Sequence, residues 1–364
     1  MTSGLPHPHP PGAGMKASGP PGKQPLAEPP GPKVRTTRVK MSLLLRCLLL
    51  LWLPALQVSA DWCYNNATCG PSTWVTLGMC NGTKQSPINI NSSAAVYNAS
   101  LGAFSFTGYD NVSSMVSITN NGHSVEVELG EGVSISGGGL PDNYVALQFH
   151  FHWGNNVTNP GSEHRLDGMQ FPMELHIVHT RKGVNLTTAT SDPQGIAVLG
   201  FFINVAPVNV DSTGLSNILK NISTTNSKIS NPGLHISINT LLSGVDLTQY
   251  FRYSGSLTTP NCSESVIWTV FKNPILLPSS LINALPATLL NAQNVPLVNV
   301  FRPPQPLNSR QVMTSVKTAS TTTGPTSSSS TTKSSSGQDA TRLPSLSGLT
   351  ALTLAVLVSL LFRN

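Results

Sequence analysis

Charged residues are scarce in this 364-residue sequence, where Asp, Glu, Lys and Arg together make up 10%. The formal net charge of +6 comes from the ends of the chain, because residues 1–60 hold seven Lys and Arg against the single acid Glu28. Residues 61–336 carry 12 basic and 13 acidic side chains, a net charge of −1. The sequence therefore gives no support for a nucleic-acid-binding surface.

Long helical periodicity and internal repeats are also absent, which argues against a helical bundle or a repeat array. Helical patterns are confined to Asp211–Lys220 and Ser279–Leu290. Short runs of alternating apolar and polar residues recur instead, at Met115–Thr119, Ser124–Leu129, Val145–Trp153, Glu174–His179, Ile196–Val205 and Val266–Phe271. Residues 61–306 are therefore expected to form one mainly β domain, a large and mostly antiparallel sheet with short helices at its edges.

The first 60 residues read as a targeting region. Residues 1–40 are rich in Pro and Gly without apolar periodicity, so we expect them to be disordered. Residues 41–60 combine an apolar run with the small residues Ser59 and Ala60, which predicts a secretory signal cleaved before Asp61. Because Met41 starts a signal of ordinary length, translation that begins there would leave residues 1–40 out of the product.

The C-terminal region changes composition twice. Residues 307–336 are rich in Ser, Thr, Lys and Gly and predict a solvated stalk. Residues 337–364 contain an apolar tail, preceded by small residues around Ser336 and a polar spacer, the order expected of a glycosylphosphatidylinositol (GPI) signal attached at Ser336. A transmembrane helix is the alternative, but Pro344 and Gly348 interrupt the tail and only Arg363 and Asn364 follow it.

Secretion predicts oxidised cysteines and N-linked sugar. Outside the signal the sequence has Cys63, Cys69, Cys80 and Cys262, which allow three pairings; the closeness of Cys63 and Cys69 suggests a local loop and leaves Cys80 to reach Cys262. Glycosylation sequons occur at Asn66, Asn81, Asn91, Asn98, Asn111, Asn156, Asn185, Asn221 and Asn261. The Asn261 sequon contains Cys262, so it is not expected to be used.

Three histidines stand on two runs with strand periodicity, where every second side chain points to the same face. His150 and His152 share a face with Gln148, and His176 shares a face with Glu174. Three imidazoles from paired strands can bind zinc and leave its fourth position open for water, as in catalytic sites. A lone His-x-His is more often coincidental; here the third His, with Gln148 and Glu174 as acceptors for the ligand N–H groups, favours zinc.

Six motifs occur in an order that resembles the α-class carbonic anhydrases, from Trp62 to Pro303. They are QSPINI at 85–90, NNGH at 120–123, QFHFHWG at 148–154, GSEH at 161–164, ELHIVH at 174–179 and GSLTTP at 255–260. The nearest branch is the secreted, lipid-anchored, disulfide-bonded one. The resemblance implies a twisted, mostly antiparallel sheet of about ten strands with zinc in a conical cleft.

The same resemblance implies an enzyme that hydrates carbon dioxide reversibly through zinc-bound hydroxide. His150, His152 and His176 match the zinc ligands, and carbonic anhydrase is itself the reference case for zinc-bound water with a pKa of about 7. Thr258 matches the residue that orients the nucleophile and donates to Glu163. Val178, Val198, Leu257, Thr258, Thr259 and Trp268 match substrate-pocket positions.

His123 matches the residue that carries the proton out of the active site in the family. Imidazole suits this role because it titrates near the pKa of zinc-bound water. Tyr64 and Asn121 match residues that contact the intervening waters. His164 and His179 follow the motifs and are expected to be structural. Glu126 departs from the family, which usually carries a neutral or apolar side chain at that position; a carboxylate facing the cleft would raise the shuttle pKa and discourage anionic inhibitors.

The expected setting is the outer face of the plasma membrane, with a GPI anchor in the outer leaflet. Carbon dioxide and bicarbonate are the expected substrates, sulfonamides and anions the expected inhibitors, and bicarbonate or proton transporters possible neighbours. The alternative is a non-catalytic ectodomain that keeps the fold for adhesion or binding. Retention of the three ligands together with Glu163, Thr258 and His123 favours the enzyme.

Overall fold

Four long strands form the centre of the sheet, and each contains one of the runs that alternation predicted. They are β7 (Tyr144–Trp153), β10 (Met173–Arg181), β11 (Ile196–Val205) and β14 (Val266–Leu277). β10 and β11 are buried on both faces over most of their length, which explains the nearly continuous apolar sequence of β11. β10 also buries the polar side chains of Glu174, His176 and His179. The computed structural model describes residues 62–207, 216, 218, 222, 228–230, 232–291 and 293–317.

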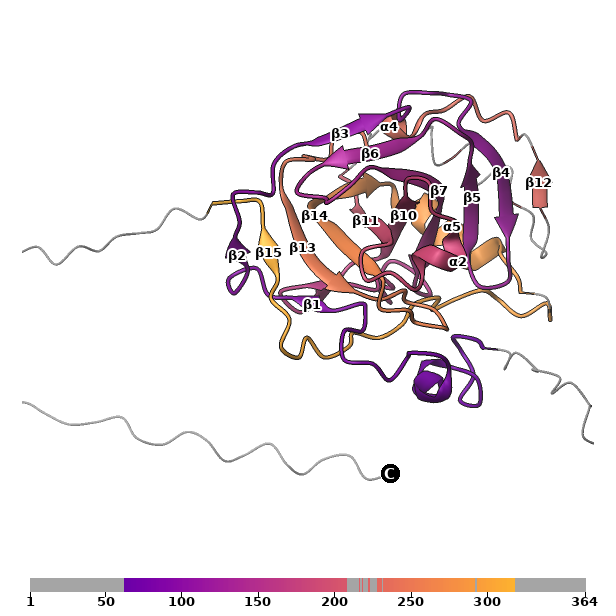
Figure 1. The fold of residues 1–364 in the computed structure, drawn as a ribbon. Helices are drawn as coiled ribbons and strands as arrows, with labels where there is room; N and C mark the ends of the chain where they lie inside the picture. Colours follow the sequence, from indigo (N-terminus) through magenta and orange to yellow (C-terminus); the bar gives the residue numbers. More distant parts are fainter. Residues whose placement is uncertain are drawn as a thin grey trace, which may run out of the picture. The chain divides into compact units, whose positions relative to one another are not determined.

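Shorter strands extend this centre on both sides (Figure 1). They are β2 (Val96–Tyr97), β3 (Phe104–Thr107), β4 (Met115–Asn120), β5 (Val125–Leu129), β6 (Ser134–Gly137), β12 (Lys228–Ser230), β13 (Tyr250–Gly255) and β15 (Met313–Thr314). Three further strands, β1 (Asn89–Ile90), β8 (Arg165–Leu166) and β9 (Met169–Gln170), form a separate sheet in the order β1-β8-β9. The main sheet has the order β12-β4-β5-β7-β10-β11-β14-β13-β15-β2, with β6 pairing β7 and β3 pairing β6. Its pairs are antiparallel except β11 with β14 and β15 with β2.

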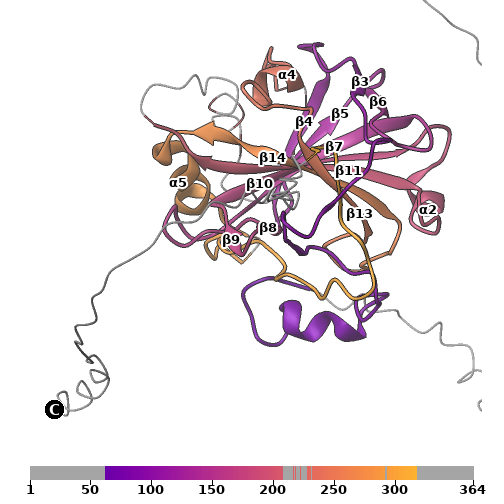
Figure 2. The ribbon, with the colours of Figure 1, turned by 90° about the vertical axis from the view of Figure 1, so that its left-hand side faces the viewer.

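The helices are short and lie around the sheet. They are the 3₁₀ helix η1 (Pro71–Thr76), α2 (Leu186–Ala189), α4 (Ile238–Leu241) and α5 (Ser279–Thr288). Figure 2 shows α5 and α2 near opposite ends of the long central strands. In the part of the chain that the structure describes, none of the helices has the length and apolar character needed to cross a membrane.

The predicted fold class is confirmed: the chain is mainly β, with a large twisted sheet and few helices. The described sheet has twelve strands rather than about ten, because it includes several pairs of only two or three residues. The predicted helix Ser279–Leu290 is α5, while Asp211–Lys220 lies largely outside the described residues. Residues 1–60 and 318–364, with the signal, most of the stalk, Ser336 and the tail, also lie outside them.

One predicted boundary needs correction. The folded part, one compact unit from Cys63 onward, does not end at Pro306, because β15 pairs with β13 and β2 and Val312 is buried. The expected stalk therefore begins later than residue 307. A two-residue strand is too short to show alternation, and the prolines before it read as a linker.

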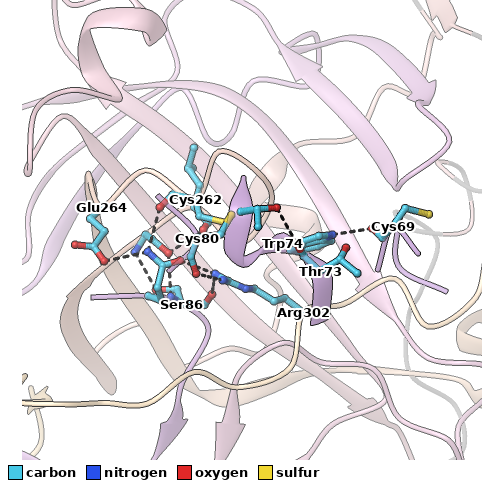
Figure 3. The surroundings of a disulfide bond; sticks show 12 residues. Cys69, Thr73, Trp74, Cys80, Ser86, Cys262, Glu264 and Arg302 are labelled. Atoms are coloured by element: carbon cyan, nitrogen blue, oxygen red, sulfur yellow. Dashed lines mark hydrogen bonds between the residues drawn. A yellow bond between two sulfur atoms is a disulfide. The ribbon is translucent and has the colours of Figure 1, made fainter. Parts of the chain in front are cut away.

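Both suggested disulfides are present, Cys63 with Cys69 and Cys80 with Cys262. The second joins residues 182 positions apart and ties the segment before β1 to the loop after β13. Arg302 lies in the same region, where its guanidinium donates to the carbonyls of Cys80 and Ser86 at 3.1 and 2.9 Å (Figure 3). Within the loop, the Cys262 N–H donates to the Thr259 carbonyl at 2.8 Å, which fixes the backbone beside Thr258.

Candidate metal centre

The pairing of β7 with β10 brings the three histidines together. His176 stands directly opposite His150, and the position opposite His152 is Glu174. The ring centroids of the three imidazoles lie 4.6 to 5.3 Å apart. One ring nitrogen from each lies within 4.8 Å of the others, so the three residues could hold a single metal ion.

Each imidazole uses its second nitrogen for a hydrogen bond within the protein. His150 Nδ1 lies 2.9 Å from Gln148 Oε1, His152 Nδ1 lies 2.9 Å from the Val300 carbonyl, and His176 Nε2 lies 2.6 Å from Glu174 Oε1. These contacts leave Nε2 of His150, Nε2 of His152 and Nδ1 of His176 as the nitrogens available to a metal.

The donor set fits zinc on two grounds. His152 Nε2 is buried without a hydrogen-bond partner among the described residues, a cost that a bound cation would remove. Burial also lowers the pKa of all three imidazoles, that of His150 to about 3, and therefore favours the neutral form that binds metal. Three neutral imidazoles suit zinc and leave one tetrahedral position for a further ligand.

Glu174 holds His176 and His164 at the same time. Its Oε1 lies 2.6 Å from His176 Nε2 and 2.6 Å from His164 Nδ1, and its Oε2 accepts the His164 backbone N–H at 2.8 Å. Burial alone would raise the pKa of Glu174, but the two neighbouring imidazoles hold it well below its usual range. His164 Nε2 in turn contacts the Tyr253 hydroxyl at 2.7 Å. The ligand atoms of His164, Glu174 and His176 also lie close enough to hold a metal ion. Both ring nitrogens of His164 are engaged with Glu174 and Tyr253, so we assign this second cluster to hydrogen-bonded support.

Glu163 is the other buried carboxyl at the site. Its Oε2 lies 3.4 Å from His152 Nε2 and 3.9 Å from His176 Nδ1, and its Oε1 accepts the Arg302 backbone N–H at 2.8 Å. Burial raises the pKa of Glu163 well above its usual range, while interactions with the Thr258 side chain and the Arg302 backbone partly oppose the shift. Glu163 and Thr258 therefore lie together beside the histidines.

A cleft of about 490 Å³ opens onto His150 and His176. All six residues expected to contact substrate line it: Val178, Val198, Leu257, Thr258, Thr259 and Trp268. We call Val178, Val198, Leu257 and Trp268 the apolar wall. The acidic wall consists of Glu126 and Glu128, which line the cleft from β5. Glu126 therefore faces the cleft.

The three residues expected to serve proton export are not among the described residues that line this cleft. His123 is partly exposed in a turn where Gly122 has a φ of 81°, a value that favours glycine. Asn121 Oδ1 accepts the backbone N–H groups of His123 and Ser124 at 2.9 and 2.7 Å, so this oxygen shapes the turn. The ring of Tyr64 packs 5.6 Å from that of Trp74, and burial and then Glu163 raise its pKa.

A family model described as eukaryotic-type carbonic anhydrase matches residues 69–316. The chain belongs to this family. Carbonic anhydrase 4 of Rattus norvegicus is 40% identical over 288 residues, which cover 76% of this chain and 91% of that protein. Carbonic anhydrase 7 of Homo sapiens is 38% identical over 68% of this chain and 95% of its own length. Carbonic anhydrase 6 of Bos taurus is 35% identical, with shares of 73% and 83%.

Membership makes the chain an enzyme of the carbonic anhydrase class, whose members use zinc, and its histidine cluster could hold such an ion. Three hydrogen bonds of this carbonic anhydrase were not predicted from the sequence: His152 with the Val300 carbonyl, Glu163 with the Arg302 backbone N–H, and His164 with the Tyr253 hydroxyl. Two of these partners are backbone groups, which are present in every residue type and so give no signal in the sequence. His179, expected to be structural, contacts the Tyr109 hydroxyl at 2.9 Å and lies outside the cluster.

Proposed function

We propose that this chain hydrates carbon dioxide reversibly to bicarbonate and a proton at the outer cell surface, with zinc held by His150, His152 and His176. The observation that supports this most is the convergence of three nitrogens whose partner nitrogens are already hydrogen-bonded. When bound, zinc supplies the polarisation that makes hydroxide available from water near neutral pH. Family membership supports the same reaction.

Thr258 and Glu163 are proposed to orient the nucleophile. The Thr258 hydroxyl would accept a hydrogen bond from the nucleophile and donate its own hydrogen to Glu163, which requires an ionised carboxylate. Burial alone works against that ionisation, but a cation bound to His152 Nε2, which lies 3.4 Å from Glu163 Oε2, would lower the pKa of Glu163 by attraction. Ligands unable to donate to Thr258 would be rejected.

The apolar wall is proposed to receive carbon dioxide. The molecule is small and has no net dipole, so apolar side chains can hold it without competing with water for hydrogen bonds. Val178, Val198 and Trp268 are almost fully buried and therefore fixed in position, and Leu257 is partly buried at their side. Thr259 gives the same wall a polar edge.

Proton export is proposed to run through His123, with Tyr64 and Asn121 contacting the waters between. His123 is partly exposed, so it can exchange protons with buffer. His123→Ala should lower turnover in weak buffer, and added imidazole should restore it. Equal turnover of variant and wild type in weak buffer would contradict the shuttle.

The proposed location rests on the signal, the two disulfides and the sequons, together with the C-terminal GPI signal. The side chains of Asn66, Asn81, Asn91, Asn111 and Asn185 are exposed and accessible to glycosylation. Release from intact cells by phosphatidylinositol-specific phospholipase C would support the lipid anchor, and retention would contradict it. A role in local pH and bicarbonate balance, beside bicarbonate or proton transporters, follows from this location.

The deciding experiment uses the full chain expressed in a secretory host. Zinc content and stopped-flow carbon dioxide hydration are measured on one sample, with His152→Gln as the test variant and the exposed His235→Gln as its control. We expect one zinc per chain and rapid hydration in wild type and control, and loss of both in His152→Gln. Zinc without hydration would instead favour a non-catalytic binding ectodomain.

A further inference from the structure

β5 presents two carboxylates to the cleft at different depths. Glu126 and Glu128 are two positions apart on this strand and therefore point to the same face. In the pairing with β7, Glu126 stands opposite His150 and Glu128 stands opposite Gln148. Glu126 is partly buried next to the histidine cluster, whereas the Glu128 side chain is 49% exposed farther out.

The two carboxylates also differ in their partners. Glu128 Oε2 accepts from Lys228 Nζ at 2.7 Å and from Ser117 Oγ at 2.8 Å, so its charge is balanced locally. The Glu126 carboxylate has no hydrogen bond or ion pair with any of the residues that the structure describes. The acidic wall therefore has one carboxylate paired with Lys228 near the solvent and, deeper in the cleft, one carboxylate without an ion-pair partner among the described residues.

We infer that Glu126 determines which ligands the cleft accepts, by disfavouring anions beside the histidines and favouring ligands that carry a positive group. This inference rests on the proposed function. Carbon dioxide is neutral and has no dipole, so its access to the apolar wall is unaffected by the carboxylate. Bicarbonate carries a negative charge, so Glu126 weakens its hold on the site and reduces product inhibition.

The size of the effect follows from Coulomb's law. Residues directly opposite on neighbouring strands have Cβ atoms about 5 Å apart, so an anion at the histidine cluster would lie within about 10 Å of the Glu126 carboxylate. With the effective dielectric of a partly buried site, one unit charge at that range changes anion affinity by about fivefold to tenfold. Glu128 should change anion affinity much less, because it is exposed to solvent and its charge is paired with Lys228.

The test measures thiocyanate binding to the zinc-loaded full chain by calorimetry, with the Michaelis constant for carbon dioxide measured on the same preparations. Glu126→Gln should bind thiocyanate about five to ten times more tightly at low salt, with the Michaelis constant changed less than about twofold. The difference should shrink as ionic strength rises, because salt screens the charge.

Two control variants separate charge from shape. Glu126→Asp keeps the charge and should bind thiocyanate like wild type. The double variant Glu128→Gln/Lys228→Gln removes one negative and one positive charge, keeps the net charge of the protein and leaves Glu126 in place, so it should also match wild type. Wild-type affinity in Glu126→Gln, or equal tightening in Glu126→Asp, would overturn the inference while leaving the proposed function intact. A wild type without zinc would overturn both.

Discussion

Glu163 and Glu174 lie on either side of the same histidine cluster, and both are completely buried, yet their pKa values shift in opposite directions. Depth of burial therefore does not decide whether a carboxyl in this site is ionised. What differs is the number of donors: Glu174 faces the imidazoles of His164 and His176 and a backbone N–H. Glu163 has one backbone N–H and the Thr258 side chain, and its Oε2 has no hydrogen-bond partner among the described residues.

The difference suits two separate tasks. Glu174 is locked by its donors and can only hold His176 and His164 in place. Glu163 keeps one oxygen available beside the histidines, where a change of hydrogen bonding during a reaction is possible. Its position depends on Arg302, whose guanidinium is fixed near the Cys80–Cys262 disulfide (Figure 3). We therefore expect Glu174 substitutions to affect stability and metal affinity, and Glu163 substitutions to affect activity.

The largest effect is expected from Glu174→Gln. The amide cannot accept from two imidazoles and a backbone N–H as the carboxylate does, so buried donors lose their partner. Breaking a buried charged network of this kind lowers the free energy of unfolding by about 3–5 kcal/mol. Metal affinity should fall by about 10- to 100-fold. Denaturant unfolding and zinc titration against a chelator measure both, and a variant as stable as wild type would remove the distinction between the carboxyls.

His179 is a buried imidazole that, unlike His164 and His176, has no carboxylate as a hydrogen-bond partner. It contacts the Tyr109 hydroxyl and the Ala197 carbonyl, and burial lowers its pKa to about 4. The native imidazole is neutral, whereas in the unfolded chain it takes up a proton below about pH 6.5. The unfolded state therefore binds more protons between pH 6.5 and 4, and stability falls as pH falls through this window, by about 3 kcal/mol in total.

The measurement for His179 is the free energy of unfolding at several pH values from 4 to 7. Wild type should lose stability steadily across this range beyond what His179→Gln loses, because the variant has no imidazole to protonate at this position. Parallel curves for the two proteins would contradict the assigned shift, whatever their absolute stabilities.

Glu163→Gln should have the opposite profile to Glu174→Gln. The amide oxygen can still accept the Arg302 N–H, so the free energy of unfolding should change by less than about 1 kcal/mol. Carbon dioxide hydration should fall by about 100-fold, since an amide is a weaker acceptor for Thr258 than a carboxylate. Stopped-flow hydration and denaturant unfolding of the same preparation test this, and a stability loss matching that of Glu174→Gln would refute the separation of roles.

The smallest effect is expected from Gln148→Ala. Gln148 supplies a single neutral acceptor to His150, and its side chain borders the cleft, where water can replace it. Zinc affinity should therefore fall by about tenfold, the lower end of the range for such supports. Competition with a chelator gives the value, with Gln194→Ala as a remote control. A loss as large as that of Glu174→Gln would show that charge does not distinguish the two supports.

The central strands and the histidine cluster could be predicted because both are encoded by alternation within single segments. His150, His152 and Gln148 reach one face of β7 by period alone, and β10 adds His176 with Glu174. Contacts from distant segments could not be predicted this way. The Val300 carbonyl reaches His152 across 148 positions, and backbone acceptors carry no side-chain signal.

The C-terminal end of the fold and its edge strands could not be predicted from the sequence pattern either. β15 is only two residues long, follows a Pro-rich segment and depends on β13 for its pairing, so residues 307–314 read as part of a stalk. The opposite pKa shifts of Glu163 and Glu174 could not be predicted for a related reason. A carboxyl's ionisation depends on donors that arrive from Arg302, His164 and Thr258, and sequence spacing fixes none of these distances.

The most direct test of the account is anomalous diffraction at the zinc edge from crystals of the zinc-loaded protein. We predict one peak, about 2.0–2.1 Å from each of His150 Nε2, His152 Nε2 and His176 Nδ1. Glu174 should remain hydrogen-bonded to His176 and outside the coordination sphere. A peak between His164, Glu174 and His176, or no peak after zinc loading, would contradict the assignment.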